Sequence, residues 1–196
     1  MVIYAPSNDS QIVYQYLLKA MSHPGQGIEV QTAFDKINGH GLLYQVAGCL
    51  IDHEVTFTVR DKRMDALQRE IADRTGALPA DWKDADFIIV DGGNSHGQIA
   101  EAKRGSLEYP DRGATIIYEI AGAAAEDSGI DTKASVQLSG PGIQSSRSPE
   151  MVGLAIEEYR LLRDINREYP MGVDAFVIKG NQFIMGLPRS TRIEVD

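Results

Sequence analysis

The chain has little cysteine, little positive charge and no long apolar run. Its single cysteine, Cys49, excludes an internal disulfide, and one thiol cannot hold a four-cysteine iron–sulfur cluster. No apolar run approaches the roughly 20 residues that a membrane helix needs. The Met1 end lacks the basic and apolar segments of a signal peptide. We therefore expect a soluble, cytoplasmic protein without a membrane partner.

Basic residues are outnumbered: 19 Lys and Arg stand against 28 Asp and Glu, a formal charge of −9. Such a surface repels phosphate backbones, so nucleic acid is not an expected partner. The imbalance is uneven, because residues 147–196 carry seven basic and eight acidic side chains. An anionic small molecule would therefore bind in this segment rather than elsewhere. The segment contains six arginines: Arg147, Arg160, Arg163, Arg167, Arg189 and Arg192.

What is present is an ordinary globular composition, with 43% hydrophobic and 24% charged residues, which excludes disorder and collagen-like structure. The length suits one domain over residues 1–196. Apolar periodicity predicts a helix capped at 7–10 and ended by Pro24, and a buried helix over 42–51. It also predicts two further helices. One is capped by Asp61 with Met64, Leu67 and Ile71 inward; the other follows Pro149, with Leu154, Ala155, Leu161, Leu162, Ile165 and Tyr169 inward.

Short apolar runs predict strands at 55–59, 87–90, 114–118 and 136–138, and a hairpin pairs 175–178 with 183–185 around a turn at 179–182. Runs that are apolar throughout indicate burial on both sheet faces. The fold class is therefore α/β: one domain with a mixed β-sheet and helices on both faces.

Two glycine patterns do not carry their usual function. Gly25 and Gly27 follow a helix rather than a strand, so a turn is favoured over a dinucleotide fingerprint. The loop 92–97 has two glycines at P-loop spacing after a strand. It is followed by Gln98 and Ile99 where a P-loop needs its lysine and hydroxyl.

Nucleophile, metal and acid–base patterns are equally weak. Cys49 and His53 are four residues apart, yet Cys49 lies in the most apolar stretch, so a buried core thiol is favoured over catalysis. The four histidines are too scattered for a zinc site, and no metal is expected. Surface solvation explains most of the carboxylates that could form an acid–base pair: Asp52, Glu54, Asp91 and Glu119. The catalytic residues stay unknown.

Two loops could contact an anion. Around Ser139, Gly140 and Gly142, a strand ends in a glycine-rich turn that leads to Arg147, and backbone N–H groups with that guanidinium could hold an anion. A plain connecting loop with a surface arginine is an equal alternative. Arg189, Thr191 and Arg192 form the second candidate, which could instead contact a partner chain.

Five ordered segments resemble the PhnH family, a component of the carbon–phosphorus lyase core complex. They are LLKAMSHPG at 17–25, PDRGAT at 110–115, LSGPGI at 138–143, YPMGVD at 169–174 and LPRSTRIEV at 187–195. Their order and spacing agree from about residue 12 to residue 195. The chain departs from the family pattern at 190–191, where it has Ser190-Thr191 and the family has two threonines. It matches the family only loosely over 76–109.

The resemblance implies a role in phosphonate use. The PhnH component acts with the G and I subunits, helped by the L subunit, to couple ATP to an alkylphosphonate. Adenine is released and a ribose 1-alkylphosphonate 5-triphosphate results; the J subunit then cleaves the carbon–phosphorus bond. The resemblance also implies the fold of pyridoxal-phosphate-dependent transferases without that cofactor, and we expect no cofactor. No lysine suits a Schiff base, since Lys19 lies near a helix end and Lys179 at a hairpin turn.

We therefore expect a structural or accessory subunit that lacks activity alone, partners with subunits G, I and J, and forms a homodimer when isolated. The alternative is a stand-alone nucleotide- or anion-binding enzyme with a site at 139–147.

Overall fold

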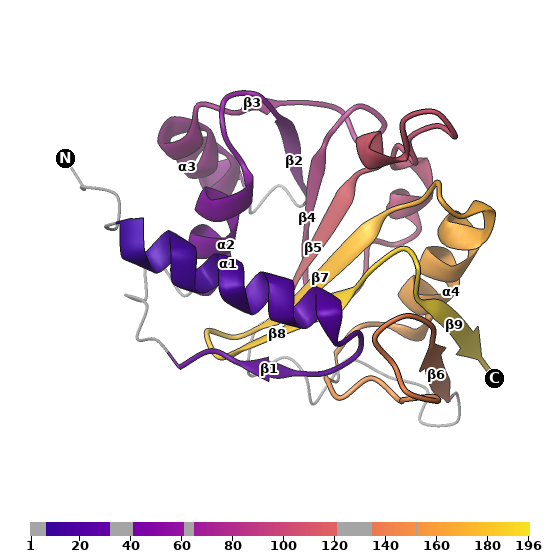
Figure 1. Ribbon diagram of the computed structural model, residues 1–196. Coiled ribbons are helices and arrows are strands. Elements are labelled where there is room, and N and C mark those ends of the chain that lie inside the picture. Colours follow the sequence, from indigo (N-terminus) through magenta and orange to yellow (C-terminus); the bar gives the residue numbers. More distant parts are fainter. Residues whose placement is uncertain (1–6, 32–40, 61–64, 121–134, 152) are drawn as a thin grey trace.

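A seven-stranded mixed β-sheet runs through the centre of the computed structural model (Figure 1), which describes residues 7–31, 41–60, 65–120, 135–151 and 153–196. The strand order is β1-β8-β7-β5-β4-β2-β3. The five strands from β7 to β3 are mutually parallel, whereas β8 is antiparallel to both of its neighbours, β7 and β1. The last strand of the chain, β9, and its partner β6 form a separate antiparallel pair.

The elements have the following bounds. The helices are α1 (Ser7–Ser22), α2 (Gly41–Leu50), α3 (Asp65–Thr75) and α4 (Ile156–Ile165), with short 3₁₀ turns η2 (Gln98–Glu101), η3 (Pro110–Arg112) and η5 (Asn166–Glu168). The strands are β1 (Ile28–Glu29), β2 (Thr56–Arg60), β3 (Leu78–Pro79), β4 (Phe87–Asp91), β5 (Thr115–Ile120), β6 (Val136–Ser139), β7 (Asp174–Lys179), β8 (Phe183–Leu187) and β9 (Arg192–Val195).

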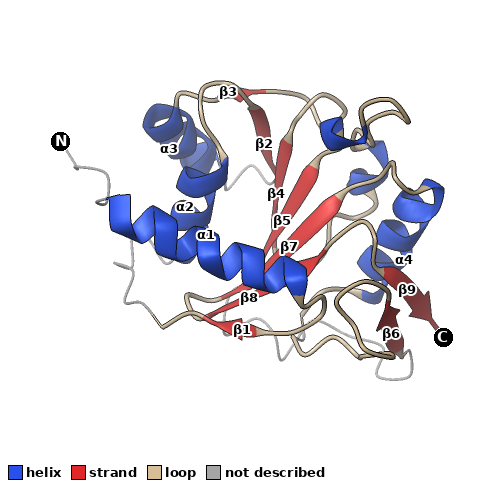
Figure 2. Ribbon diagram, viewed as in Figure 1, coloured by secondary structure: helices blue, strands red, loops and turns tan. Residues whose placement is uncertain are grey.

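Each face of the large sheet has its own core. Helices α1, α2 and α3 pack on one face together with Ile89 and Ile117, while α4 and the β6–β9 pair cover the other, where Ile88 and Ile116 point (Figure 2). Neighbouring residues of one strand thus enter opposite cores, because side chains alternate along a strand. The predicted mixed sheet with helices on both faces is confirmed.

Most predicted elements lie where the periodicity places them. Helix α1 ends at Ser22, just before Pro24, and Val13, Leu17 and Ala20 form its buried side. The predicted hairpin is the β7–β8 pair, with Ile178 opposite Ile184. In α3, Leu67 and Ile71 are buried as predicted; Asp61 and Met64 lie outside the described residues. No helix in the described part of the chain is both long and apolar enough to span a membrane.

The long helix predicted after Pro149 is wrong at both ends. It begins only at Ile156, because Gly153 has a φ of +117° and the N–H of Ala155 donates to the carbonyl of Gly93 (2.8 Å) rather than within a helix. Leu154 is buried but precedes the helix, and Ala155 is its N-cap. At the other end the α-helix stops at Ile165, and Tyr169 is 65% exposed instead of facing inward.

The strand predicted at 136–138 exists but is not buried on two faces. It is β6, and within it only Leu138 is buried, so the stretch is not covered on both sides. Its partner is β9, with Ser139 opposite Arg192. This small sheet brings the glycine-rich turn after β6 next to the loop between β8 and β9.

Candidate functional site

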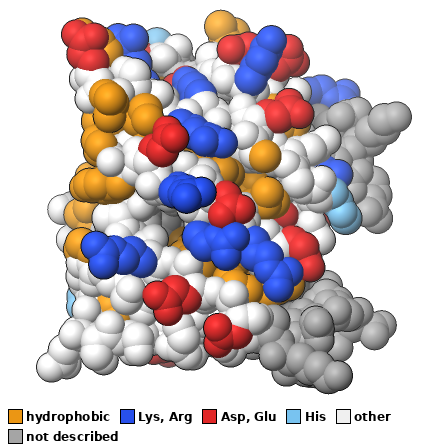
Figure 3. All heavy atoms as spheres, turned by 90° about the vertical axis from the view of Figure 1, so that its right-hand side faces the viewer, with side chains coloured by type: hydrophobic (Ala, Val, Ile, Leu, Met, Phe, Trp, Pro, Cys, Tyr) orange, Lys and Arg blue, Asp and Glu red, His pale blue; other side chains and the backbone are white. Residues whose placement is uncertain are grey.

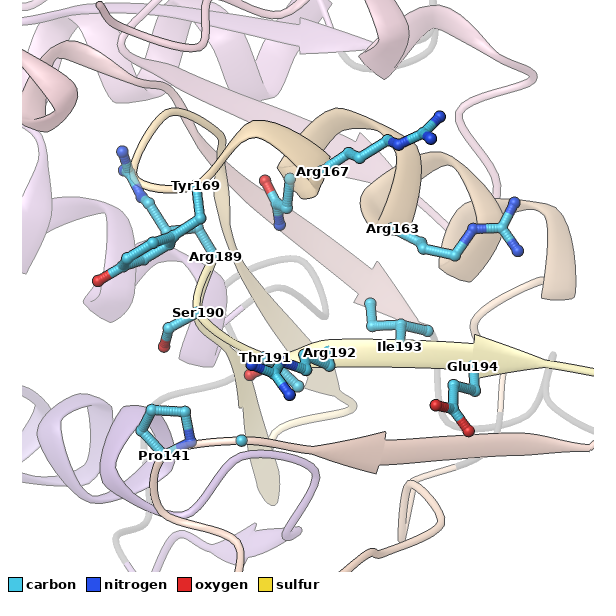
Figure 4. Close-up of a pocket in the computed structure, with 12 residues that line it drawn as sticks. Pro141, Arg163, Arg167, Tyr169, Arg189, Ser190, Thr191, Arg192, Ile193 and Glu194 are labelled. Carbon is cyan, nitrogen blue, oxygen red and sulfur yellow. The ribbon is translucent and has the colours of Figure 1, made fainter. Parts of the chain in front are cut away.

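A cavity of about 700 Å³ lies where three chain segments meet beside α4. The turn after β6 contributes Gly140 and Pro141, the end of α4 and the residues beyond it contribute a second wall, and 189–194 contribute the third (Figure 4). Gly140 has a φ of +120°, and a Cβ there would lie 3.0 Å from the Ser190 carbonyl oxygen. Glycine thus lets the two loops approach each other.

Four arginines line this cavity: Arg163, Arg167, Arg189 and Arg192. Lys and Arg side chains form a band across the side of the molecule on which α4 and β9 lie (Figure 3). The surrounding protein is acidic overall, with a charge of −9. Positive charge gathered in a concave place on such a protein favours an anionic group.

The four guanidinium groups differ in how far they are already paired. Arg189 donates through Nη2 (2.6 Å) and Nε (3.1 Å) to Asp174 Oδ2, and through Nη1 to the Pro110 carbonyl. Its charge is compensated by Asp174, so its first role is structural. Arg163 contacts the adjacent Asp164 at 2.9 Å, and this contact raises the pKa of Arg163. Within the described part of the chain, no partner is found for Arg167 or Arg192.

Thr191 lies in the wall of the cavity with its hydroxyl turned into the protein. The residue is only 5% exposed, and its Oγ1 has no hydrogen-bond partner among the described residues. Its backbone N–H donates to the Pro188 carbonyl (2.8 Å), which closes the turn between β8 and β9. Thr191 therefore shapes this turn.

Arg147 and Gly142, predicted with Gly140, lie elsewhere. Arg147 and Leu138 exchange two backbone hydrogen bonds (2.7 and 2.9 Å), and Arg147 Nη1 donates to Gln26 Oε1 at 3.4 Å. Gly142 has a φ of +83°, and a Cβ there would lie 2.5 Å from the Ser22 carbonyl oxygen. Both residues thus hold the β6 turn against the end of α1. Gly140 thus lines the arginine-lined cavity, whereas Gly142 and Arg147 do not.

The candidate nucleophile and base do not form a pair. Cys49 is half-buried, its Sγ donates to the Ser10 carbonyl (3.5 Å), and burial raises its thiol pKa. His53 is exposed. Cys49 is thus packed beside α1, as the core interpretation predicts, although it is less buried than expected. In the described residues, no group of three His, Cys, Asp or Glu side chains could hold a metal.

Two carboxylates differ from expectation. Asp52, Glu54 and Asp91 are exposed, but Glu119 is only 5% exposed. Glu158, which the sequence reasoning missed, is fully buried. It accepts hydrogen bonds from Ser95 N and Oγ (both 2.8 Å) and from the Tyr118 hydroxyl (2.6 Å). The available signal was its position one turn before Leu162, on the inward stripe of α4.

Comparisons with known proteins involve almost the whole chain. A family model described as "Bacterial phosphonate metabolism protein (PhnH)" matches residues 3–194. A relative from Stutzerimonas stutzeri, named "Putative C-P lyase subunit protein HtxG", is 26% identical over 187 residues, which cover 94% of this chain and 86% of that protein.

Proposed function

The chain belongs to the PhnH family of bacterial phosphonate metabolism proteins, and we propose that it is an accessory subunit of a carbon–phosphorus lyase complex. The observation that carries the proposal is the family match, which extends over residues 3–194 and so covers almost the whole chain. A relative that aligns along most of its own length is named as a C-P lyase subunit, which supports the same role.

The reaction in which this subunit would take part is the one the family resemblance implies. ATP and an alkylphosphonate give adenine and a ribose 1-alkylphosphonate 5-triphosphate. Breaking a glycosidic bond develops oxocarbenium character and calls for a pair of positioned acid–base or nucleophilic groups. Where described, the carboxylates Asp52, Glu54 and Asp91 are scattered on the surface, and Glu158 already serves three hydrogen-bond donors. This supports placing the chemistry on another subunit.

The arginine-lined cavity is the place where this chain would contact an anion of the complex. Arg167 and Arg192 line it, and neither has a counterion among the described residues. Two bidentate donors of this kind suit a triphosphate, a phosphonate or an acidic segment of a partner subunit. Gly140, Arg189 and Thr191 would then shape the cavity rather than donate to the anion.

The proposal extends to the assembly. The chain would act as one domain over 1–196, work in the cytoplasm, join subunits G, I and J, and form a homodimer when isolated. The fold of pyridoxal-phosphate-dependent transferases, without that cofactor, belongs to the same proposal. The seven-stranded mixed sheet is compatible with it.

Reconstituted synthesis tests the role directly. Subunits G, I, J and L are mixed with ATP and methylphosphonate, and adenine release is measured with and without this chain. We expect turnover only when the chain is added. Full turnover without it would refute the role.

Paired variants test the cavity in the same assay. Arg167→Ala and Arg192→Ala should reduce turnover or assembly at least fivefold. Arg160→Ala is the matched control, because Arg160 lies on α4 with its side chain 45% exposed and outside the cavity. If all three variants have equal activity, the cavity does not contact an anion. If Arg147→Ala and Arg189→Ala leave turnover unchanged, the anion contacts predicted from the sequence are refuted as well.

A further inference from the structure

The parallel part of the sheet contains a point at which the chain reverses its direction of travel across the sheet. Strand β2 lies between β3 and β4. The connection after β2 leads outward to β3, whereas the connection after β4 leads the opposite way, to β5. In open α/β sheets, ligands bind outside the carboxyl ends of the two strands at such a point. Here those ends are Arg60 and Asp91.

A second cavity, of about 200 Å³, lies at this place. It is lined by Arg60, Asp91, Asn94 and His96, and all four side chains are polar. The arginine-lined cavity shares none of these residues. The volume is below the roughly 300–1,000 Å³ of pockets that enclose a drug-sized ligand, so it suits one hydrophilic part of a molecule.

The loop that carries Asn94 and His96 is fixed from behind. Ser95 is fully buried and donates twice to Glu158 on α4, and the Gly93 carbonyl accepts the N–H of Ala155 (2.8 Å). Next to these anchors His96 has a φ of +51°, a left-handed conformation that is uncommon for residues other than glycine. Backbone strain of this kind persists only where the surroundings enforce it, and it clusters at functional sites.

The four side chains together have the chemistry of a sugar site. The Asp91 carboxylate has no described partner and can accept two hydroxyl hydrogens. Asn94 Oδ1 accepts the N–H of His96 (2.7 Å), which leaves its amide NH₂ to donate. Arg60 donates to the Ser95 carbonyl and keeps further N–H groups. Because Arg60 and Asp91 balance in charge, the cavity does not favour a free anion.

We propose that this cavity binds the vicinal hydroxyl groups of a sugar ring, with Asp91 accepting from both hydroxyls and Asn94 and Arg60 donating to their oxygens. The choice of a ribosyl ring as the probe rests on the proposed function. The argument for a polyol site rests on the cavity itself.

Binding to the purified full-length chain tests the proposal. Adenosine, ribose 5-phosphate and inorganic phosphate are titrated separately by calorimetry, and histidine ring resonances are followed by NMR. We expect adenosine and ribose 5-phosphate to bind and to shift the ring resonances of His96 but not those of His23 or His53. Asp91→Asn should weaken both affinities at least tenfold.

Two matched variants keep the result specific. Asp111→Asn removes an exposed carboxylate outside this cavity, and Arg167→Ala alters only the other cavity; both should bind adenosine like the wild type. Three results would overturn the proposal: no saturable binding of either sugar, equal affinity in Asp91→Asn, or displacement of adenosine by inorganic phosphate. None of these results touches the dependence of the reconstituted complex on this chain, so the two proposals fail separately.

Discussion

Removing the Tyr118 hydroxyl should destabilise the protein, because this group is one of three donors to a buried carboxylate. In Tyr118→Phe the ring stays in place and Glu158 loses the 2.6 Å hydrogen bond. Both side chains are completely buried, so bulk water does not replace the donor without rearrangement. A hydrogen bond to a charged group is worth about 1.5–3 kcal/mol, and we expect a loss in that range.

The measurement is urea unfolding followed by far-UV circular dichroism, with the change in midpoint converted through a common slope. Tyr159→Phe is the matched control. Tyr159 is also buried at 4% exposure, but no hydrogen bond of its hydroxyl is found among the described residues. We expect this control to lose less than about 0.5 kcal/mol, within the usual range of a substitution that removes no specific interaction.

A double-mutant cycle shows whether the loss belongs to the pair. In a Glu158→Gln background the acceptor is neutral, and its amide can reorient towards the tyrosine. Tyr118→Phe should then cost about 1 kcal/mol less than in the wild type, since uncharged hydrogen bonds contribute about 0.5–1.5 kcal/mol. If Tyr118→Phe is no more harmful than Tyr159→Phe, or if the two substitutions in the cycle add, the buried carboxylate network does not stabilise the fold as described.

Three further predictions concern pH, backbone packing and an ion pair. Burial raises the pKa values of Tyr44, Tyr118 and Tyr159, so their stabilising effect is complete below pH 10, where unfolded tyrosine is also protonated. Above about pH 10 stability should fall by about 1.4 kcal/mol per pH unit for each tyrosine, and Tyr118→Phe should make the fall measured in urea titrations less steep. Gly93→Ala should prevent folding or lower the melting temperature far more than Gly92→Ala. A Cβ at Gly93 would lie 1.7 Å from the Gly153 carbonyl oxygen, whereas a Cβ at Gly92 would meet nothing within 4 Å. Equal melting temperatures of the two variants would contradict this packing. Asp174→Ala should lower the free energy of unfolding by about 1–3 kcal/mol, because the side chain of Arg189 is only 14% exposed and would lose its carboxylate partner. Asp164→Ala, which removes the exposed ion pair with Arg163, should leave the urea midpoint unchanged. Similar midpoints for the two variants would refute the structural role of Arg189.

Local patterns determined most of the elements. Pro24 ends α1 because its ring disfavours helical dihedrals at the residue before it, and the apolar runs of β4 and β5 predict strands buried on both faces. The same kind of reasoning failed after Pro149. The sequence there is compatible with a helix, but Gly153 takes a positive φ and Ala155 bonds to Gly93, a residue far earlier in the chain.

The sequence predicted some of the residues that line the cavity, but not which of them lie together. It pointed to an arginine-rich C-terminal quarter and to seven residues: Ser139, Gly140, Gly142, Arg147, Arg189, Thr191 and Arg192. Of these seven, Gly140, Arg189, Thr191 and Arg192 line the cavity. The sequence could not tell which arginines are paired, because the partners lie far away in sequence. Arg189 donates to Asp174 and to the Pro110 carbonyl, and Arg147 donates to Gln26. Arginines with similar local sequence thus differ in whether their guanidinium groups are already paired or remain available to a ligand.

The sequence by itself therefore determined the fold class, the family and the segment that carries the positive charge, since periodicity, motif order and composition are properties of the chain as read. Only the tertiary structure decided which residues share a cavity. The order of strands in the sheet places Arg60 beside Asp91, and helix α4 supplies the buried carboxylate that holds Ser95. Both depend on contacts between residues far apart in sequence, for which no local pattern carries a signal.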